Sequence, residues 1–305
     1  MSKNIIVTGA TGKQGGALIE QLANNAEFTL IAITRNATGA GADKLKSKGS
    51  NIKVVQGDQN DCPALFEAAE SQASGPIWGV YSVQIAQGHG PASGSGDETK
   101  QGCDMIDEAV KAGVKHFVYS SVERGGDERS WENPIPSVGH FATKHNVEQH
   151  LKKKASSMGW TILRPVAFFE NLTPGFPAKV FMAAMQSTVG EKRVQWISTK
   201  DIGFFAALAF KKPQEWNHKA MGLAGDELNV NELCDKVRDN TKTTIYPTFW
   251  FLGGVLKYMV AEIGSMINWF GAEGYKADIA ACKRVHPQMM DLETWLKTES
   301  TFPRM

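Results

Sequence analysis

The sequence has few cysteines and almost no net charge. Its four cysteines, among 305 residues, are far apart, and no two of them form a C-x-x-C pair. A zinc site or a thioredoxin-like redox motif would need such close pairs, so we expect neither. The net charge is only +1, which gives no reason to expect nucleic acid or an acidic membrane surface as a main partner.

An apolar leader segment and an internal repeat are also missing from the sequence. Unpaired cysteines without a signal segment predict a reducing, cytoplasmic setting, with the nucleus as an alternative. One stretch, Phe249–Phe270, is long enough to span a bilayer, but it contains Lys257, Glu262 and three glycines. Central charges are costly in a membrane. We therefore expect no membrane span here, and instead a pocket wall, a core helix or a subunit contact.

What the sequence does contain suits a globular protein with a large core. Hydrophobic residues make up 42% of the chain and charged residues 21%. At this length the chain can form one large domain or two coupled ones.

A glycine-rich turn at the start of the chain carries the strongest signal. A short apolar run, Ile5–Val7, is followed by glycines at spacing G-x-x-G-x-x-G and then by a helical pattern, Lys13–Leu22. Strand, glycine turn and helix together form a dinucleotide-binding fingerprint, whereas glycines alone would also fit an ordinary turn. In that fingerprint Gly9 permits the tight turn, Gly12 lets the backbone approach a pyrophosphate, and Gly15 lets the helix pack closely.

Strand-like and helical patterns alternate through the first half of the chain. The expected strands are Ile5–Val7, Phe28–Thr34, Ile52–Gln56, Ile77–Val83, Lys115–Ser120 and Trp160–Leu163. The expected helices are Lys13–Leu22, Pro63–Ala73 with Asp61 as its N-cap, Thr99–Ala112 and Gly139–Ser157. This alternation predicts an α/β fold, a Rossmann-type doubly wound parallel sheet. Ligands of such sheets bind beyond the carboxyl ends of the strands.

The alternation weakens beyond residue 172, which suggests a second domain. We expect residues 1–165 to form the dinucleotide-binding Rossmann domain, with residues 193–224 returning to it. Residues 166–305 would mainly form a smaller C-terminal α+β domain that supplies the substrate or partner side.

The residues after the second strand favour NADP(H) over NAD(H). An NAD site would place an acid here to bond the ribose 2′-hydroxyl, but no acid occurs from Thr29 to Ala42. Arg35 and Asn36 stand there instead, and a guanidinium suits a 2′-phosphate. Lys13 in the glycine turn adds a second cation. The alternative is that Arg35 is an ordinary solvated arginine.

Further polar residues follow the next strands. After the third strand, Asp58 would bond the adenine amino group or stabilise a turn, and Gln59 adjoins it. Gln84 follows the fourth strand and precedes a Gly- and Ser-rich segment, Gly88–Gly96, which is either a mobile loop over the cofactor or a surface excursion. Lys100 at the start of the next helix would serve a phosphate.

The fifth strand leads to a polar segment and then a histidine-containing helix. Two glycines and several acids predict a flexible surface loop over residues 125–136. His140 and Lys144, four residues apart, share one face of the following helix. His145 and His150 are rotated off that face, so we expect no three-histidine metal site.

After the sixth strand comes an aromatic segment, Phe168-Phe169-Glu170-Asn171. It falls near the position where a nicotinamide ring would end. The aromatic pair would either wall that ring or belong to the core, and the residues alone favour the core.

In order and at these spacings, the landmarks resemble the NmrA-like family, an atypical branch of the short-chain dehydrogenase/reductase superfamily. The resemblance covers nearly the whole chain and includes the motifs Lys100-Gln101-Gly102 and Asp201-Ile202-Gly203. It implies an NADP(H) site in a Rossmann-type domain. The cofactor contacts expected from the residues and the resemblance together are Gly9, Ala10, Thr11, Gly12, Lys13, Gln14, Gly15, Arg35, Asn36, Asp58, Gln59, Gln84, Lys100, Lys144, Phe168, Phe169, Glu170 and Asn171.

The chain departs from the superfamily at the proton donor. Typical members use a serine together with Tyr-x-x-x-Lys on a helix. Here Lys144 is present, His140 occupies the tyrosine position, and Ser120 or Ser121 could fill the serine role. Lys144 and His140 are therefore the candidate catalytic residues, with the usual acid missing.

Three hypotheses follow. The first is a redox-sensing, NADP(H)-responsive regulator without turnover, because NmrA-like proteins typically bind transcription factors or enzymes. The second is an NADPH-dependent oxidoreductase that reduces a hydrophobic carbonyl or enone-type substrate, with Lys144 as acid/base. The third is a Rossmann module used only for assembly, since fold alone does not fix function.

Overall fold

A computed structural model describes residues 2–84, 98–135 and 137–304. The chain divides into two compact units, each assembled from three separate segments. The first unit comprises Met1–Ser121, Thr143–Arg164 and Thr199–Met221, and the second comprises Val122–Ala142, Pro165–Ser198 and Gly222–Met305. The expected loop Gly88–Gly96 lies outside the described residues.

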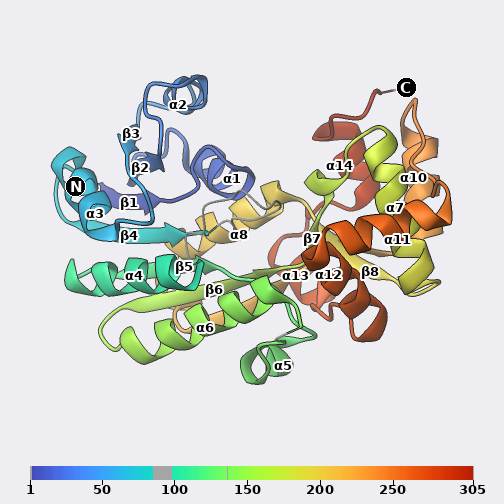
Figure 1. Ribbon diagram of the computed structural model, residues 1–305. Coiled ribbons are helices and arrows are strands. Elements are labelled where there is room, and N and C mark those ends of the chain that lie inside the picture. Colours follow the sequence, from blue (N-terminus) through green and yellow to red (C-terminus); the bar gives the residue numbers. More distant parts are fainter. Residues whose placement is uncertain (1, 85–97, 136, 305) are drawn as a thin grey trace. The chain divides into compact units, whose positions relative to one another are not determined.

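The first unit is built on a seven-stranded sheet of Rossmann type (Figure 1). Its order is β3-β2-β1-β4-β5-β6-β9, and the pairs from β3 through β6 are parallel. The strands are β1 (Lys3–Val7), β2 (Phe28–Thr34), β3 (Ile52–Gln56), β4 (Ile77–Ser82), β5 (His116–Ser120), β6 (Gly159–Pro165) and β9 (Lys219–Leu223). The predicted fold class is confirmed.

Continuous apolar strands explain why this sheet is covered on both faces. In β1, Ile5, Ile6 and Val7 are all fully buried. Successive side chains of a strand point to opposite faces, so burial of three in a row requires a layer on each side.

Helices form those two layers. Figure 1 shows α1 and α8 on one face of the sheet and α4 and α6 on the other, with α3 beside α4. The helices of this unit are α1 (Lys13–Leu22), α2 (Ala40–Lys46), α3 (Cys62–Gln72), α4 (Glu98–Lys111), α6 (Gly139–Lys154), α8 (Thr199–Lys211) and α9 (Pro213–Trp216). Helix α6 begins in the second unit and continues in the first from Thr143.

In each layer, one glycine allows two helices to pack closely against each other. A Cβ at Gly203 of α8 would lie 2.6 Å from the backbone of Ala17 in α1. On the other face, a Cβ at Gly102 of α4 would lie 2.6 Å from Val147 of α6. Both motif glycines are therefore required by packing.

The second unit combines a small sheet with several helices. Its sheet has the order β10-β8-β7, with β8 parallel to β7 and antiparallel to β10. The strands are β7 (Ala167–Phe168), β8 (Val194–Ile197) and β10 (Asp226–Leu228), and a 3-10 turn covers Phe169–Asn171. The helices are α5 (Asp127–Glu132), α7 (Phe176–Val189), α10 (Val230–Asn240), α11 (Trp250–Met259), α12 (Ala261–Ala272), α13 (Ile279–Val285) and α14 (Leu292–Thr298).

The prediction of a flexible surface loop over residues 125–136 was wrong for its described part. Helix α5 occupies Asp127–Glu132. The carboxylate of Glu123, which is buried, accepts hydrogen bonds from the backbone N–H groups of Gly125 and Lys276, 3.0 and 3.1 Å away. This buried acid thus anchors the start of the segment.

The apolar stretch Phe249–Phe270 forms two helices instead of one. Val260 lies between the end of α11 and the start of α12. A Cβ at Gly264 would lie 2.6 Å from the carbonyl oxygen of Lys257, so a glycine is needed where the two helices meet. Within the described ranges, no helix is both long and apolar enough to cross a membrane.

Candidate functional site

The glycine turn between β1 and α1 has the geometry that its spacing predicts. Gly9 has a φ of +57°, and a Cβ there would lie 2.8 Å from Val83. A Cβ at Gly15 would lie 2.4 Å from the carbonyl oxygen of Gly9, so α1 could not start this close to the strand with any other residue. At Gly12 the nearest atom to a Cβ is the same oxygen, 3.2 Å away.

The start of α1 is suited to an anion. Gly12 is its N-cap and supplies no capping side chain, and the first turn contains no acid. The first N–H groups of a helix and its dipole then attract negative charge. Thr11 and Lys13 are exposed beside this helix start, while Ala10 is buried.

Gln14 fixes the first turn of α1 to the sheet. Its Oε1 accepts a hydrogen bond from the Ser120 hydroxyl at 2.6 Å and a longer one from the Tyr81 hydroxyl at 3.4 Å. These partners lie on β5 and β4. The predicted contact residue Gln14 therefore positions the helix start as well.

Arg35 and Asn36 follow β2, next to the glycine turn in strand order. Asn36 Oδ1 accepts hydrogen bonds from the N–H and the hydroxyl of Thr38, both at 3.1 Å, which shapes the turn. Arg35 is exposed, and among the described residues none forms a hydrogen bond or ion pair with its guanidinium. The side chain is available to a phosphate at this edge.

Asp58 and Gln59 follow β3, and Gln84 follows β4. Asp58 is exposed, and its carboxylate accepts the N–H of Asn60 at 2.9 Å, as a turn aspartate does. Gln84 Nε2 donates to Gln59 Oε1 at 2.9 Å, and Gln59 Nε2 donates to the Val83 carbonyl at 3.3 Å. The two glutamines are thus joined, whereas Asp58 stands apart from them.

Lys144 is buried at the same edge and is held by several partners. Its Nζ lies 2.8 Å from Glu98 Oε1, donates to the Gln84 carbonyl at 3.2 Å, and lies 5.5 Å from the centre of the Tyr119 ring. Sequence reasoning missed Glu98. An acid in the first turn of a helix is common, so nothing local distinguished it.

Lys100 lies in the first turn of α4. Its ammonium pairs with Asp104 one turn along the same helix, and its side chain is 66% exposed. The other two residues of its motif have packing roles: Gln101 Nε2 donates to Asn60 Oδ1 at 2.8 Å, and Gly102 packs against Val147.

The candidate catalytic groups each have a separate partner. His140 Nδ1 lies 2.8 Å from Glu262 Oε1, in the second unit. That contact makes Nδ1–H the donor and leaves the acceptor role to Nε2 in the neutral ring. Lys144, one turn further along α6, pairs with Glu98 as described above.

The two candidate serines are also engaged elsewhere. Ser120 donates to Gln14, and Ser121 donates to the carboxylate of Glu148. Glu148 in turn forms an ion pair with Arg164 at 2.7 Å, with both side chains fully buried.

The segment Phe168–Asn171 lies in the second unit and is largely anchored there. The Phe169 ring is fully buried, with ring centres of Trp196 and Trp295 at 6.4 and 5.6 Å. Glu170 Oε1 accepts hydrogen bonds from the Ser198 hydroxyl and the Trp295 indole, both at 3.1 Å. Phe168 is half-buried and Asn171 is exposed.

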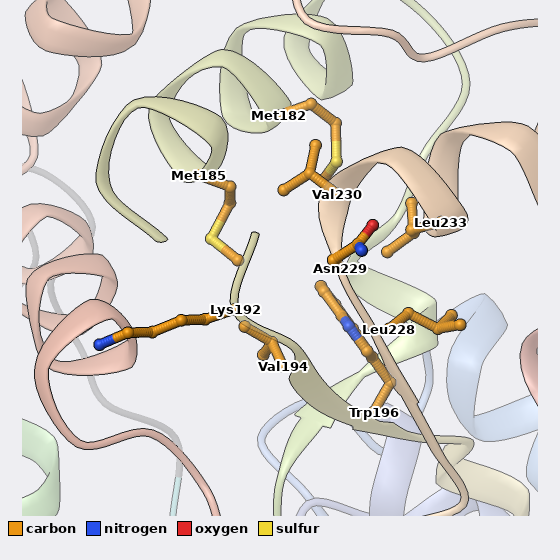
Figure 2. A pocket seen from close by; sticks show the side chains of 9 residues that line it. All are labelled: Met182, Met185, Lys192, Val194, Trp196, Leu228, Asn229, Val230 and Leu233. Carbon is orange, nitrogen blue, oxygen red and sulfur yellow. The ribbon is translucent and has the colours of Figure 1, made fainter. Parts of the chain in front are cut away.

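A narrow apolar recess lies in the second unit and is lined in part by Trp196, the neighbour of Phe169. Figure 2 shows Met182 and Met185 of α7 across from Trp196 and Leu228. The recess is too narrow to admit a water molecule. It therefore offers no room for a dinucleotide.

No group of three His, Cys, Asp or Glu residues suited to a metal occurs in the part of the chain that the structure describes. His150 Nε2, for example, lies 2.8 Å from Asp107.

Comparison with known proteins identifies relatives of two kinds. An NmrA-like family domain-containing oxidoreductase of Aspergillus hancockii, hkm9, is 25% identical, with 78% of this chain and 72% of that protein covered. An NAD(P)H azoreductase of Xenophilus azovorans is 28% identical over 70% of this chain and 65% of that protein. The nitrogen metabolite repression protein nmr of Neurospora crassa is 31% identical over 50% of this chain and only 33% of that protein.

Solved structures agree on the fold. NmrA, a negative transcriptional regulator in complex with NADP, matches with a TM-score of 0.71 at 20% identity, covering 98% of this chain and 95% of that one. A Citrobacter triphenylmethane reductase complexed with NADP(H) matches with a TM-score of 0.70 at 18% identity, covering 98% and 100%. An NADPH-dependent quinone oxidoreductase of Escherichia coli complexed with NADPH gives 0.68 at 21% identity, covering 96% and 98%.

A model of the NmrA-like family matches residues 1–296, nearly the whole sequence. The match confirms the resemblance inferred from the motifs. The chain belongs to the NmrA-like family.

Proposed function

We propose that this protein binds NADP(H) at the carboxyl edge of its large sheet and acts as an NADP(H)-responsive regulator. The observation that supports the second part is that each candidate catalytic group is engaged by a partner of its own: His140 pairs with Glu262, Lys144 with Glu98, and Ser120 with Gln14. A proton donor for hydride transfer needs to be positioned toward the reacting atom.

The residues of the first unit fit the cofactor. A Cβ at Gly9 or Gly15 would collide with neighbouring atoms, so the turn is shaped for close backbone approach. The N-terminus of α1 suits the pyrophosphate. Arg35 and Lys13 are exposed cations at the same edge, and they would hold a 2′-phosphate. NmrA and two reductases of this fold have been crystallised with NADP, NADP(H) or NADPH.

The partner would be a transcription factor or an enzyme whose binding depends on cofactor occupancy. Two relatives support this class, because NmrA is a negative transcriptional regulator and nmr is a nitrogen metabolite repression protein. In such a device the cofactor changes the equilibrium between two protein states, and the partner must bind these states differently.

Calorimetry with NADP, NADPH, NAD and NADH tests the cofactor, and a carbonyl panel then tests for turnover. We expect NADP and NADPH to bind about tenfold or more tightly than NAD and NADH, through charge-assisted bonds between the 2′-phosphate and Arg35. We expect no NADPH oxidation. Steady consumption of NADPH with a defined substrate would overturn the regulator assignment, and equal binding of all four cofactors would overturn the 2′-phosphate site.

A second candidate function is reduction of an apolar carbonyl or enone-type substrate, with Lys144 as acid/base. The names of the relatives favour it, since they include an azoreductase and a quinone oxidoreductase. An apolar surface on α11 would suit such a substrate, because Phe251, Val255 and Tyr258 are exposed there. A Lys144→Met protein that reduced its substrate at the normal rate would remove this role of the lysine.

A further inference from the structure

The contact between α4 and α6 fixes a pair of charged residues at the cofactor edge. Helices normally pack 8–10 Å apart. Here Gly102 faces Val147, and a Cβ at Gly102 would lie 2.6 and 2.8 Å from the two methyl carbons of Val147. The absence of a side chain at residue 102 therefore allows the two helices to approach.

One turn back along each helix, the side chains meet across this contact. Glu98 precedes Gly102 by four residues, and Thr143 precedes Val147 by four. Residues four apart lie on the same face of a helix. Accordingly, Glu98 Oε1 lies 2.8 Å from Lys144 Nζ, and the Thr143 hydroxyl donates to Glu98 Oε2 at 2.8 Å.

The pair is buried. Lys144 is 8% and Glu98 7% exposed. A buried ion pair contributes little net stability, because desolvation of both charges offsets their attraction. A better explanation for such a pair is that it fixes the conformation of the lysine side chain, which matters if the lysine has a role at this position.

The ammonium is also held from the sheet side. It donates to the Gln84 carbonyl just beyond β4 and lies over the ring of Tyr119 near the end of β5. Gln84 is itself bonded to Gln59 beyond β3. Glu98 thus completes a polar chain that joins residues beyond the carboxyl ends of β3, β4 and β5, the side of the sheet on which dinucleotides bind in this fold.

We propose that Glu98 is the positioning residue of the cofactor site, acting through Lys144. Its carboxylate keeps the lysine side chain directed along the sheet edge, and the Gly102–Val147 contact sets the carboxylate in place. This inference rests on the proposed NADP(H) site. It adds Glu98, a residue of α4 that is not among the cofactor contacts expected from the sequence.

A double-mutant cycle on NADPH affinity tests the proposal. The variants are Glu98→Gln, Lys144→Met and the two combined, with Glu108→Gln as a control on the same helix, where Glu108 pairs with exposed Lys111. We expect each single variant to weaken binding about tenfold and the double variant to bind no more weakly than Lys144→Met alone. Wild-type affinity in Glu98→Gln, or losses that multiply in the double variant, would overturn the proposal.

The same set of variants also controls for effects on folding. Glu98→Gln leaves a buried ammonium without its counter-charge, which is destabilising, whereas the double variant removes both charges. If Glu98→Gln fails to fold, Lys144→Met is compared with the double variant. Equal affinities are expected, and a further loss in the double variant would overturn the proposal.

A chemical measurement tests the role of Glu98 independently of cofactor binding. Reductive methylation of lysines, followed by mass spectrometry, measures how accessible the Lys144 amine is without any ligand. We expect Glu98→Gln to raise the methylation rate of Lys144 severalfold, with Lys111 unchanged as internal reference. An unchanged rate at Lys144 would overturn the positioning role. Failure of the wild-type protein to bind any dinucleotide would overturn the proposed function instead.

Discussion

At the scale of single residues, we expect Arg35 to decide between the two cofactors. Its guanidinium is exposed after β2, so its replacement should leave folding unaffected. We expect Arg35→Ala to weaken NADP(H) binding about tenfold to a hundredfold through loss of a charge-assisted phosphate contact, with little change for NAD(H). Calorimetry measures both.

Arg284→Ala is the matched control for that prediction. Arg284 is also exposed, and it pairs with Asp278 in the second unit. It should leave all four affinities unchanged. Equal losses for NADP and NAD in Arg35→Ala would show that the arginine does not read the 2′-phosphate. A folded Arg35→Ala protein that has lost NADP binding would exclude the assembly-only hypothesis.

His116 provides a residue-scale prediction about pH. Burial lowers the pKa of its imidazole to about 4, and its Nε2 donates to the Thr161 hydroxyl at 3.0 Å. The unfolded chain therefore takes up a proton near pH 6.5, whereas the folded protein resists protonation until about pH 4. The contribution of His116 to folding stability is therefore complete above pH 6.5, and it is lost progressively as the pH falls toward 4.

Between pH 7.5 and 5 this one residue should remove about 2 kcal/mol of the free energy of unfolding. Urea unfolding of the wild type and of His116→Gln at both pH values measures it. Other acids titrate in the same range, so the difference between the two proteins is the relevant quantity. Identical pH dependence in both would contradict the prediction.

At the scale of elements, close helix packing depends on particular glycines. A Cβ at Gly203 of α8 would meet backbone atoms of Ala17, which cannot rotate away. We expect Gly203→Ala to destabilise the protein by about 1–3 kcal/mol despite the higher helix propensity of alanine. Gly254→Ala on α11 is the control, since a Cβ there meets nothing within 4 Å and should stabilise slightly. Thermal unfolding that ranks the two variants in the reverse order would refute this packing account.

Elements with a strong local pattern could be predicted closely from the sequence. Strand β2 and helix α1 have the expected bounds, and Asp61 caps α3 as predicted. Helices α2 and α5 were missed because they are short and polar, with little periodicity to detect. The break at Val260 was hidden inside one continuous apolar run.

The site could be predicted only where its residues are close in sequence. The glycine turn depends on local spacing, and the structure gives it the expected geometry. Glu98 was invisible because its partner, Lys144, is 46 positions away and on another helix, and only the packing of α4 on α6 brings them together. The partners of His140 and Ser120 were unpredictable for the same reason.

At the scale of the whole molecule, the discontinuous make-up of the first unit predicts how the chain can be divided. Residues 1–165 contain the glycine turn, Arg35 and Lys144, but they lack α8, which packs on α1, and β9, which follows β6 in the sheet. Without α8, the apolar face of α1 around Leu18 would be exposed to water. We therefore expect fragment 1–165 to remain unfolded or aggregate. The full-length protein should show a dispersed amide spectrum and bind NADP. A fragment 1–165 with an equally dispersed spectrum and full affinity for NADP would show that the returning segment is dispensable for the cofactor site.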